Sequence, residues 1–123
     1  MTDAKSDTRK YETVYSRFRE DAYRAVRRAS FGEDIGQNSW LTAPELRRFC
    51  AQLTLSPASH VLEAASGDGE PAIFMAEETG CQVAGVDIQR AGVAAANETV
   101  GTRQLAVRAR FRGSLRFAET GSL

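Results

Sequence analysis

The N-terminal part of the chain carries apolar residues at helical spacing. Between residues 11 and 29 they recur every three or four positions, which places them on one stripe of a helix. Charged residues outside this stripe include Arg17, Arg24, Arg27 and Arg28. The pattern predicts an amphipathic helix with a solvated arginine face, after a disordered start at residues 1–9. A basic surface for nucleic acid is the alternative, although interspersed acids dilute its charge.

A second helix is predicted after a polar, glycine-containing loop that ends near Trp40. Thr42 suits the N-cap, Glu45 follows three positions later as in a capping box, and Pro44 suits the first turn. The apolar face of this helix is then formed by Leu46, Phe49, Cys50 and Leu53.

The period of the pattern changes after residue 56. Three short runs suited to strands, HVLEAA, CQVAGVDI and LAVRARFRG, alternate with PAIFMAEET and AGVAAANET, which suit helices. Gly80 stands where a left-handed cap of the first of these helices belongs. This order predicts parallel βαβ units and therefore an α/β fold. In the third run Arg108, Arg110 and Arg112 alternate with apolar residues, which predicts an edge strand with one wet face.

Composition narrows the class of protein. The 123 residues suit one domain, and 16 basic residues balance 16 acidic ones, which argues against nucleic acid or an anionic membrane as partner. No secretory-type segment and no apolar run of about 18 residues are found, so we expect a cytoplasmic protein. Cys50 and Cys81 lack a C-x-x-C pattern, which favours reduced thiols over a lone disulfide. No metal-ligand set and no activated nucleophile are apparent, so we predict no metal and no catalytic side chain.

The stretch VLEAASGDGEPA, residues 61–72, joins the first predicted strand to its helix. Gly67 and Gly69 allow a sharp turn and a close approach of a ligand to backbone N–H groups. Asp87 ends the second strand 20 residues after Gly67, where a carboxylate can accept hydrogen bonds from both hydroxyls of a ribose. Because ligands bind beyond the carboxyl ends of parallel strands, these features predict a nucleoside-containing cofactor. A tight turn beside an ordinary surface aspartate is the alternative.

Two cofactors fit this pattern. Gly67-x-Gly69-x-x-Ala72 matches the turn of NAD-type dinucleotide folds. Glu63 argues against a dinucleotide, because a carboxylate close to the glycines repels a pyrophosphate. A cofactor with an amino group and a sulfonium gains from the same carboxylate, and S-adenosylmethionine carries both groups and a ribose.

These motifs resemble those of class I S-adenosylmethionine-dependent methyltransferases, whose first motif commonly runs V-L-D/E-x-G-x-G-x-G. Glu63 matches the acid of this motif, and Gly67 and Gly69 match its second and third glycines. Asp87 matches the ribose acid, whereas Ala65 stands where the first glycine is usual. Alanine, unlike glycine, disfavours positive φ.

The resemblance implies a partial Rossmann-like methyltransferase fold. Three parallel strands in the order 3-2-1 would follow a set of N-terminal helices. Residues 10–56 would form a helical lid segment over the cofactor pocket, and residues 57–123 an incomplete cofactor-binding domain. By this resemblance Gln37, Asn38 and Trp40 line the lid, with the Trp40 ring near the sulfonium; core packing under the loop is the alternative for Trp40. The predicted cofactor contacts are Gln37, Trp40, Glu63, Ala65, Ser66, Gly67, Gly69, Asp87 and Ile88.

The resemblance implies methyl transfer from S-adenosylmethionine to a small-molecule acceptor. The sulfonium is already activated, so the protein mainly has to orient the acceptor, which accounts for the absence of a catalytic side chain. Ser114 and Leu115 stand where family members carry a further acid, and little sequence follows them. We therefore expect a truncated domain with little activity alone and self-association through its exposed first strand. An NAD-type fold and a non-enzymatic remnant or interaction module are the alternatives.

Overall fold

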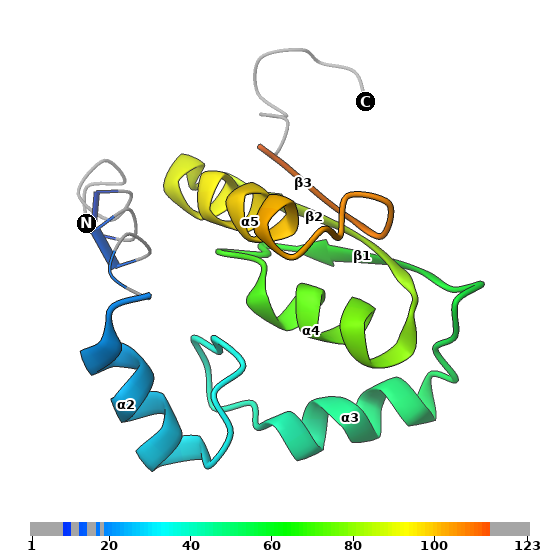
Figure 1. Ribbon diagram of the computed structural model, residues 1–123, viewed down its shortest axis with the longest axis horizontal. Coiled ribbons are helices and arrows are strands. Elements are labelled where there is room, and N and C mark those ends of the chain that lie inside the picture. Colours follow the sequence, from blue (N-terminus) through cyan, green and yellow to red (C-terminus); the bar gives the residue numbers. More distant parts are fainter. Residues whose placement is uncertain (1–8, 11–12, 15–16, 18, 114–123) are drawn as a thin grey trace, which may run out of the picture.

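The computed structural model describes most of the chain, namely residues 9–10, 13–14, 17 and 19–113. Its centre is a sheet of three parallel strands, β1 (His60–Ala64), β2 (Gln82–Asp87) and β3 (Ala109–Gly113), in the order β1-β2-β3. Helices lie beside this sheet (Figure 1). The predicted α/β class and the three parallel strands are confirmed.

One face of the sheet is covered by two helices, α4 (Glu70–Thr79) and α5 (Arg90–Thr102). Both are crossover connections between neighbouring parallel strands, so both pack on the same side. No described helix packs on the opposite face, and there Leu62 is 70% exposed. The buried core joins strands and helices through Ala72, Ile73, Ala76, Cys81, Val83, Ala96, Val100, Ala109 and Phe111.

The third strand is shorter than predicted. Residues 105–108 form a turn, and Val107 is 78% exposed rather than inward-facing. The predicted alternation is confirmed within β3 itself, because Phe111 is buried between two exposed arginines, Arg110 and Arg112. The predicted end of this strand at Ser114 and Leu115 lies outside the described residues.

The helix α3 (Ala43–Gln52) begins with the predicted capping box. The Glu45 N–H donates to Thr42 Oγ1 at 3.3 Å, and the Thr42 N–H donates to Glu45 Oε2 at 2.9 Å. Leu46 is buried with Phe74 of α4, whereas Phe49 is half-exposed and Leu53 is exposed. The predicted apolar face was therefore too wide.

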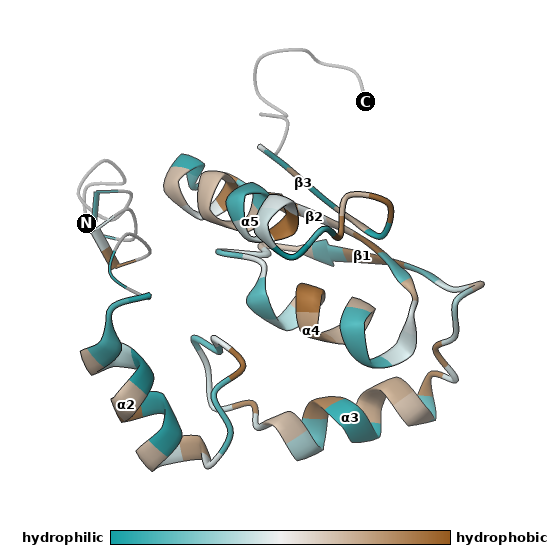
Figure 2. Cartoon of the chain, viewed as in Figure 1, coloured by the Kyte–Doolittle hydropathy of each residue, from teal (hydrophilic) through white to brown (hydrophobic). Residues whose placement is uncertain are grey.

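The prediction of one continuous helix from residue 11 to 29 is wrong, because helix α2 covers only Asp21–Phe31. Glu20 interrupts the helical path with extended backbone angles (φ −63°, ψ 142°). The predicted faces are also wrong. Val26 is 63% exposed, whereas Arg27 is 8% exposed. Hydrophilic residues cover much of α2, while α4 and α5 show strongly hydrophobic positions (Figure 2).

Other sequence features can be located briefly. Gly80 caps α4 in the predicted left-handed conformation, with φ of 74°. Cys50 and Cys81 are both buried and free. Within the described residues, every helix is too short or too polar to cross a lipid bilayer.

Candidate functional site

The glycine loop, residues 65–69, follows β1 at the carboxyl edge of the sheet and leads directly into α4. Three of its residues have left-handed backbone angles: Ala65 (φ 58°), Gly67 (φ 58°) and Gly69 (φ 77°). The chain thus makes the expected kind of turn although alanine replaces the usual first glycine. Holding Ala65 there costs on the order of 1 kcal/mol, because its Cβ crowds the carbonyl oxygen.

The loop is packed tightly against the core below it. A Cβ added at Gly69 would lie 2.7 Å from the Phe111 ring and 2.8 Å from the Ala96 Cβ. On α5, a Cβ at Gly92 would lie 2.6 Å from the Gly67 carbonyl oxygen. Neither position has room for a larger residue, so the loop, α5 and β3 fix one another.

Asp87, at the end of β2, holds the glycine loop in place. Its Oδ2 accepts a hydrogen bond from the Gly67 N–H at 2.7 Å, and its Oδ1 accepts one from the Gln89 N–H at 2.7 Å. The Ser66 N–H also donates to the Val86 carbonyl at 3.1 Å. Asp87 is buried, and each of its oxygens already has a backbone donor. In this arrangement its carboxylate orders the loop that would receive a ligand.

Glu63 emerges on the same covered face as Asp87, because it is paired with Gly85, two residues before Asp87. Its Oε2 atom is buried and has no hydrogen-bond partner among the described residues. Burial, followed by repulsion from Asp68 and Asp87, raises the pKa of Glu63 to about 7. Such an oxygen beside the loop is suited to a cationic hydrogen-bond donor.

Asp68 adds a third carboxylate to the glycine loop. Burial raises the pKa of Asp68 to about 6, although the Glu70 N–H donates to it at 3.3 Å and acts in the opposite direction. Within the described part of the chain, no group of three such side chains has the arrangement of a metal site. Glu63, Asp68 and Asp87 therefore create a negative surrounding that favours an organic cation.

The remaining predicted contacts near the loop differ in exposure. Ser66 is buried, and its Oγ is near Gly85 beneath the loop, with no hydrogen-bond partner among the described residues. Ile88 is exposed directly after Asp87. Gln89, which the sequence analysis missed, is buried, and its Oε1 also lacks a partner in the described chain. Only its position two residues after Asp87 could have indicated it.

Gln37 and Trp40 both lie on the loop between α2 and α3. Gln37 is buried, but its Oε1 accepts from the Ile35 N–H and its Nε2 donates to the Glu33 carbonyl, so it stabilises its own loop. Trp40 is 88% exposed and meets Phe31 edge-to-face at 6.5 Å between ring centroids. The alternative prediction that Trp40 packs in the core is therefore wrong, because its ring faces solvent.

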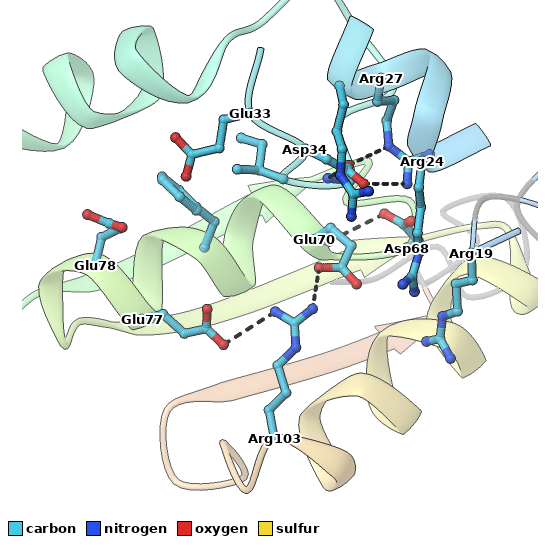
Figure 3. A pocket seen from close by; sticks show the side chains of 14 residues that line it. Arg19, Arg24, Arg27, Glu33, Asp34, Asp68, Glu70, Glu77, Glu78 and Arg103 are labelled. Atoms are coloured by element: carbon cyan, nitrogen blue, oxygen red, sulfur yellow. Dashed lines mark hydrogen bonds and ion pairs between the residues drawn. The ribbon is translucent and has the colours of Figure 1, made fainter. Parts of the chain in front are cut away.

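A cavity of about 390 Å³ lies between α2, residues 33–36 and α4. None of the nine predicted cofactor contacts lines it; Asp68 is the residue that it shares with the glycine loop. Figure 3 shows arginines from α2 facing acids of α4 across this space. The prediction that these arginines form a solvated face is therefore wrong for Arg27, which is buried, because the sequence does not specify what lies opposite α2.

Arg27 and Asp34 form a buried ion pair at one side of this cavity. The Arg27 Nε donates to Asp34 Oδ1 at 2.6 Å. Burial alone would raise the pKa of Asp34, but hydrogen bonds from Arg27 and the Gly36 N–H lower it overall. This pair explains why an arginine is the buried residue of α2.

The chain is similar to several solved structures. A methyltransferase dependent on S-adenosylmethionine from Geobacter sulfurreducens, in complex with S-adenosyl-L-homocysteine, is 28% identical, with a TM-score of 0.54, over 60% of this chain and 30% of that chain. YjhP from E. coli is 16% identical, with a TM-score of 0.60, over 85% of this chain and 36% of that chain. An RNA methyltransferase from Salinibacter ruber, also with S-adenosyl-L-homocysteine, is 22% identical, with a TM-score of 0.56, over 60% and 48%.

These similarities confirm the resemblance in fold. The described chain has part of the class I S-adenosylmethionine-dependent methyltransferase fold, and it spans less than half the length of each of these three structures. No family model and no curated protein matches the sequence.

Proposed function

We propose that this chain binds S-adenosylmethionine at the glycine loop and belongs to an enzyme that methylates a small molecule. The observation that carries the proposal is the buried Oε2 of Glu63, which has no hydrogen-bond partner among the described residues. It lies beside a loop that Asp87 holds in place at the carboxyl edge of the sheet. S-adenosylmethionine would supply an already activated methyl group. Its amino group matches the chemistry of Glu63, and its polar atoms match the N–H groups of the loop.

The roles of the chain's own residues follow from this placement. Glu63 would accept a hydrogen bond from the cofactor's ammonium group, and Gly67 and Gly69 would let that end approach the backbone. Asp87 would hold the loop and stay close to the ribose. Ile88 would add an apolar edge to this site. We propose no general acid or base, since methyl transfer from a sulfonium requires orientation and exclusion of water.

The charge of the site separates this proposal from an NAD-type function. Asp68 and Asp87 both repel the Glu63 carboxylate beside the loop, and each of the three would also repel a pyrophosphate. A positively charged ligand would instead lower the cost of ionising Glu63. The same carboxylates thus favour a cationic cofactor over a dinucleotide.

Parallel calorimetric titrations with S-adenosylhomocysteine and NADH test the proposal. We expect S-adenosylhomocysteine to bind at least tenfold more tightly. Glu63→Gln should weaken it by about five- to tenfold, because a charge-assisted hydrogen bond contributes on the order of 1 kcal/mol more than a neutral one. Glu98→Gln, on the exposed side of α5, is the matched control. Tighter binding of NADH would contradict the proposal, as would binding of neither cofactor by a folded chain.

The pH dependence of binding gives an independent check. With its pKa raised to about 7, Glu63 is mostly protonated at pH 6 and mostly ionised at pH 8. The ammonium group of S-adenosylhomocysteine is bound better by the ionised form of Glu63, so affinity for this ligand should rise over this interval. Glu63→Gln should remove most of that rise; a pH dependence that the substitution leaves intact would assign it to another group.

We also propose that copies of this chain associate through β1. Its outer edge has no neighbouring strand among the described residues, and Leu62 beside that edge is exposed. Light scattering should show dimers or larger species, which Leu62→Lys should reduce. Val107→Lys, at another exposed apolar residue away from this edge, should have little effect. A monodisperse monomer would contradict this association.

A further inference from the structure

The cavity between α2 and α4 has one cationic wall and one acidic wall. All four side chains that α2 and the residues just before it contribute are arginines: Arg19, Arg24, Arg27 and Arg28. The α4 side contributes mainly glutamates, together with Asp68 from the glycine loop. Ile35 and Phe74 add an apolar strip to the lining. A volume of about 390 Å³ lies in the range of small-molecule sites.

Most of the charges around the cavity are paired. Arg27 is paired with Asp34 at 2.6 Å, and Arg103 bridges Glu70 and Glu77 at 3.2 and 3.3 Å. Arg19 is held on α5 by the Thr99 hydroxyl at 2.7 Å and by Glu98 at 3.2 Å. These three arginines therefore connect neighbouring segments of the fold and already have partners.

Arg24 and Arg28 are different, since neither forms an ion pair within the described residues, although Arg28 is close enough to Asp34 to help lower its pKa. They stand four positions apart on α2, so they lie on the same face of the helix and repel each other. Figure 3 shows Arg24 pointing from α2 into the cavity, which Asp68 also lines. An anion placed between the two guanidinium groups would relieve the repulsion and accept several hydrogen bonds.

We propose that this cavity binds the methyl acceptor and that the acceptor is a small molecule with a carboxylate on an apolar body. The carboxylate would meet Arg24 and Arg28, and the body would lie along Ile35 and Phe74. Asp68 joins this cavity to the glycine loop, so the far end of the acceptor would point toward the cofactor. The identification of the ligand as a methyl acceptor rests on the proposed function. Anion binding in the cavity can be measured without the cofactor.

Benzoate is a suitable probe, and benzamide is its neutral counterpart of the same shape. Binding to the full chain is followed by chemical shifts in ¹⁵N-labelled protein. We expect benzoate to bind at millimolar concentration or better, at least tenfold more tightly than benzamide. The double variant Arg24→Gln/Arg28→Gln should lose at least tenfold in benzoate affinity. Arg48→Gln, at an exposed arginine of α3 outside the cavity, should retain it.

The outcomes separate this inference from the proposed function. If S-adenosylhomocysteine binds but benzoate and benzamide bind equally, or the double variant keeps its benzoate affinity, the acceptor assignment is overturned and the cofactor proposal stands. If benzoate binding needs the two arginines but S-adenosylhomocysteine does not bind, the anion site stands and the methyltransferase proposal is lost. A single-stranded RNA 12-mer that binds more tightly than benzoate through the same arginines would also overturn it, in favour of an RNA acceptor.

Discussion

Two loops of this molecule were expected to hold the same cofactor, and they are built differently. The glycine loop, residues 65–69, is tied to the neighbouring strand by Asp87 and has no free space beneath Gly69. In the loop at residues 32–42, the Gln37 side chain forms its hydrogen bonds within the loop, and Trp40 is exposed to solvent. The role of a loop residue depends on the segments that pack against it. The glycine motif and Asp87 specify those segments for the first loop, whereas no motif specifies them for the second.

The largest effect is expected from filling the space under the glycine loop. Gly69→Ala should destabilise the protein by about 3–4 kcal/mol, because a Cβ would clash with Phe111 and Ala96 and because Gly69 has φ of 77°. Gly32→Ala is the control: its φ of 80° is also positive, although its ψ of −62° differs from the −1° of Gly69, and no atom lies within 4 Å of the added Cβ. Urea unfolding should show a loss of about 1–2 kcal/mol there. Equal losses would show that packing under the loop contributes nothing.

Asp87→Asn should have the next largest effect. The amide has one oxygen to accept hydrogen bonds and no charge, so one of the two backbone donors at 2.7 Å would lose its partner. We expect a loss of about 2 kcal/mol in unfolding free energy, with weaker binding of S-adenosylhomocysteine. Asp21→Asn, at the exposed start of α2, should change stability by less than about 0.5 kcal/mol. A stable Asp87→Asn variant with unchanged affinity would contradict the anchoring role.

Ala65→Gly should stabilise the protein, by up to about 1 kcal/mol. Glycine adopts φ of 58° without the strain that alanine bears there, although its greater freedom in the unfolded chain offsets part of the gain. Thr54→Gly, at φ of 55° and remote from the loop, should give a similar gain in thermal unfolding. Only the change at Ala65 should alter affinity for S-adenosylhomocysteine. A loss of stability at Ala65 would show that its methyl group makes contacts that outweigh the strain.

The smallest effect is expected in the second loop. Trp40→Ser removes a side chain that is 88% exposed, so stability should change by less than about 0.5 kcal/mol. Affinity for S-adenosylmethionine should change by no more than about twofold. A tenfold loss would restore the lid role that the sequence resemblance gave to Trp40, and the two loops would then act on one ligand.

Much of the fold was predictable from the sequence because its pattern is local. Short apolar runs alternate with helical segments, and Thr42 and Glu45 specify the start of α3 within four residues. The covered face could also be read from alternation, as Ala109 and Phe111 show. The helix at α2 was mispredicted because its periodic alanines and valines do not pack on the core; the ion pair between Arg27 and Asp34 determines which side is buried.

The candidate site was predictable only at positions where the residue type itself indicates the backbone conformation. Gly67 and Gly69 have the positive φ that their residue type favours. That Asp87 would accept from the Gly67 N–H, or that Asp68 would be buried with a raised pKa, depends on contacts between segments and could not be read from spacing. The cavity beside α2 depends on the docking of a whole helix, for which the sequence shows no motif.

The bond between Gly67 and Asp87 also bears on the order of events during folding. Twenty residues and a complete helix separate its two ends, so the turn cannot hold its final shape until the second strand has docked beside the first. A ligand that requires this turn would select molecules in which the sheet is already assembled. Its capture during refolding would therefore report the closure of the first crossover rather than the formation of any single helix.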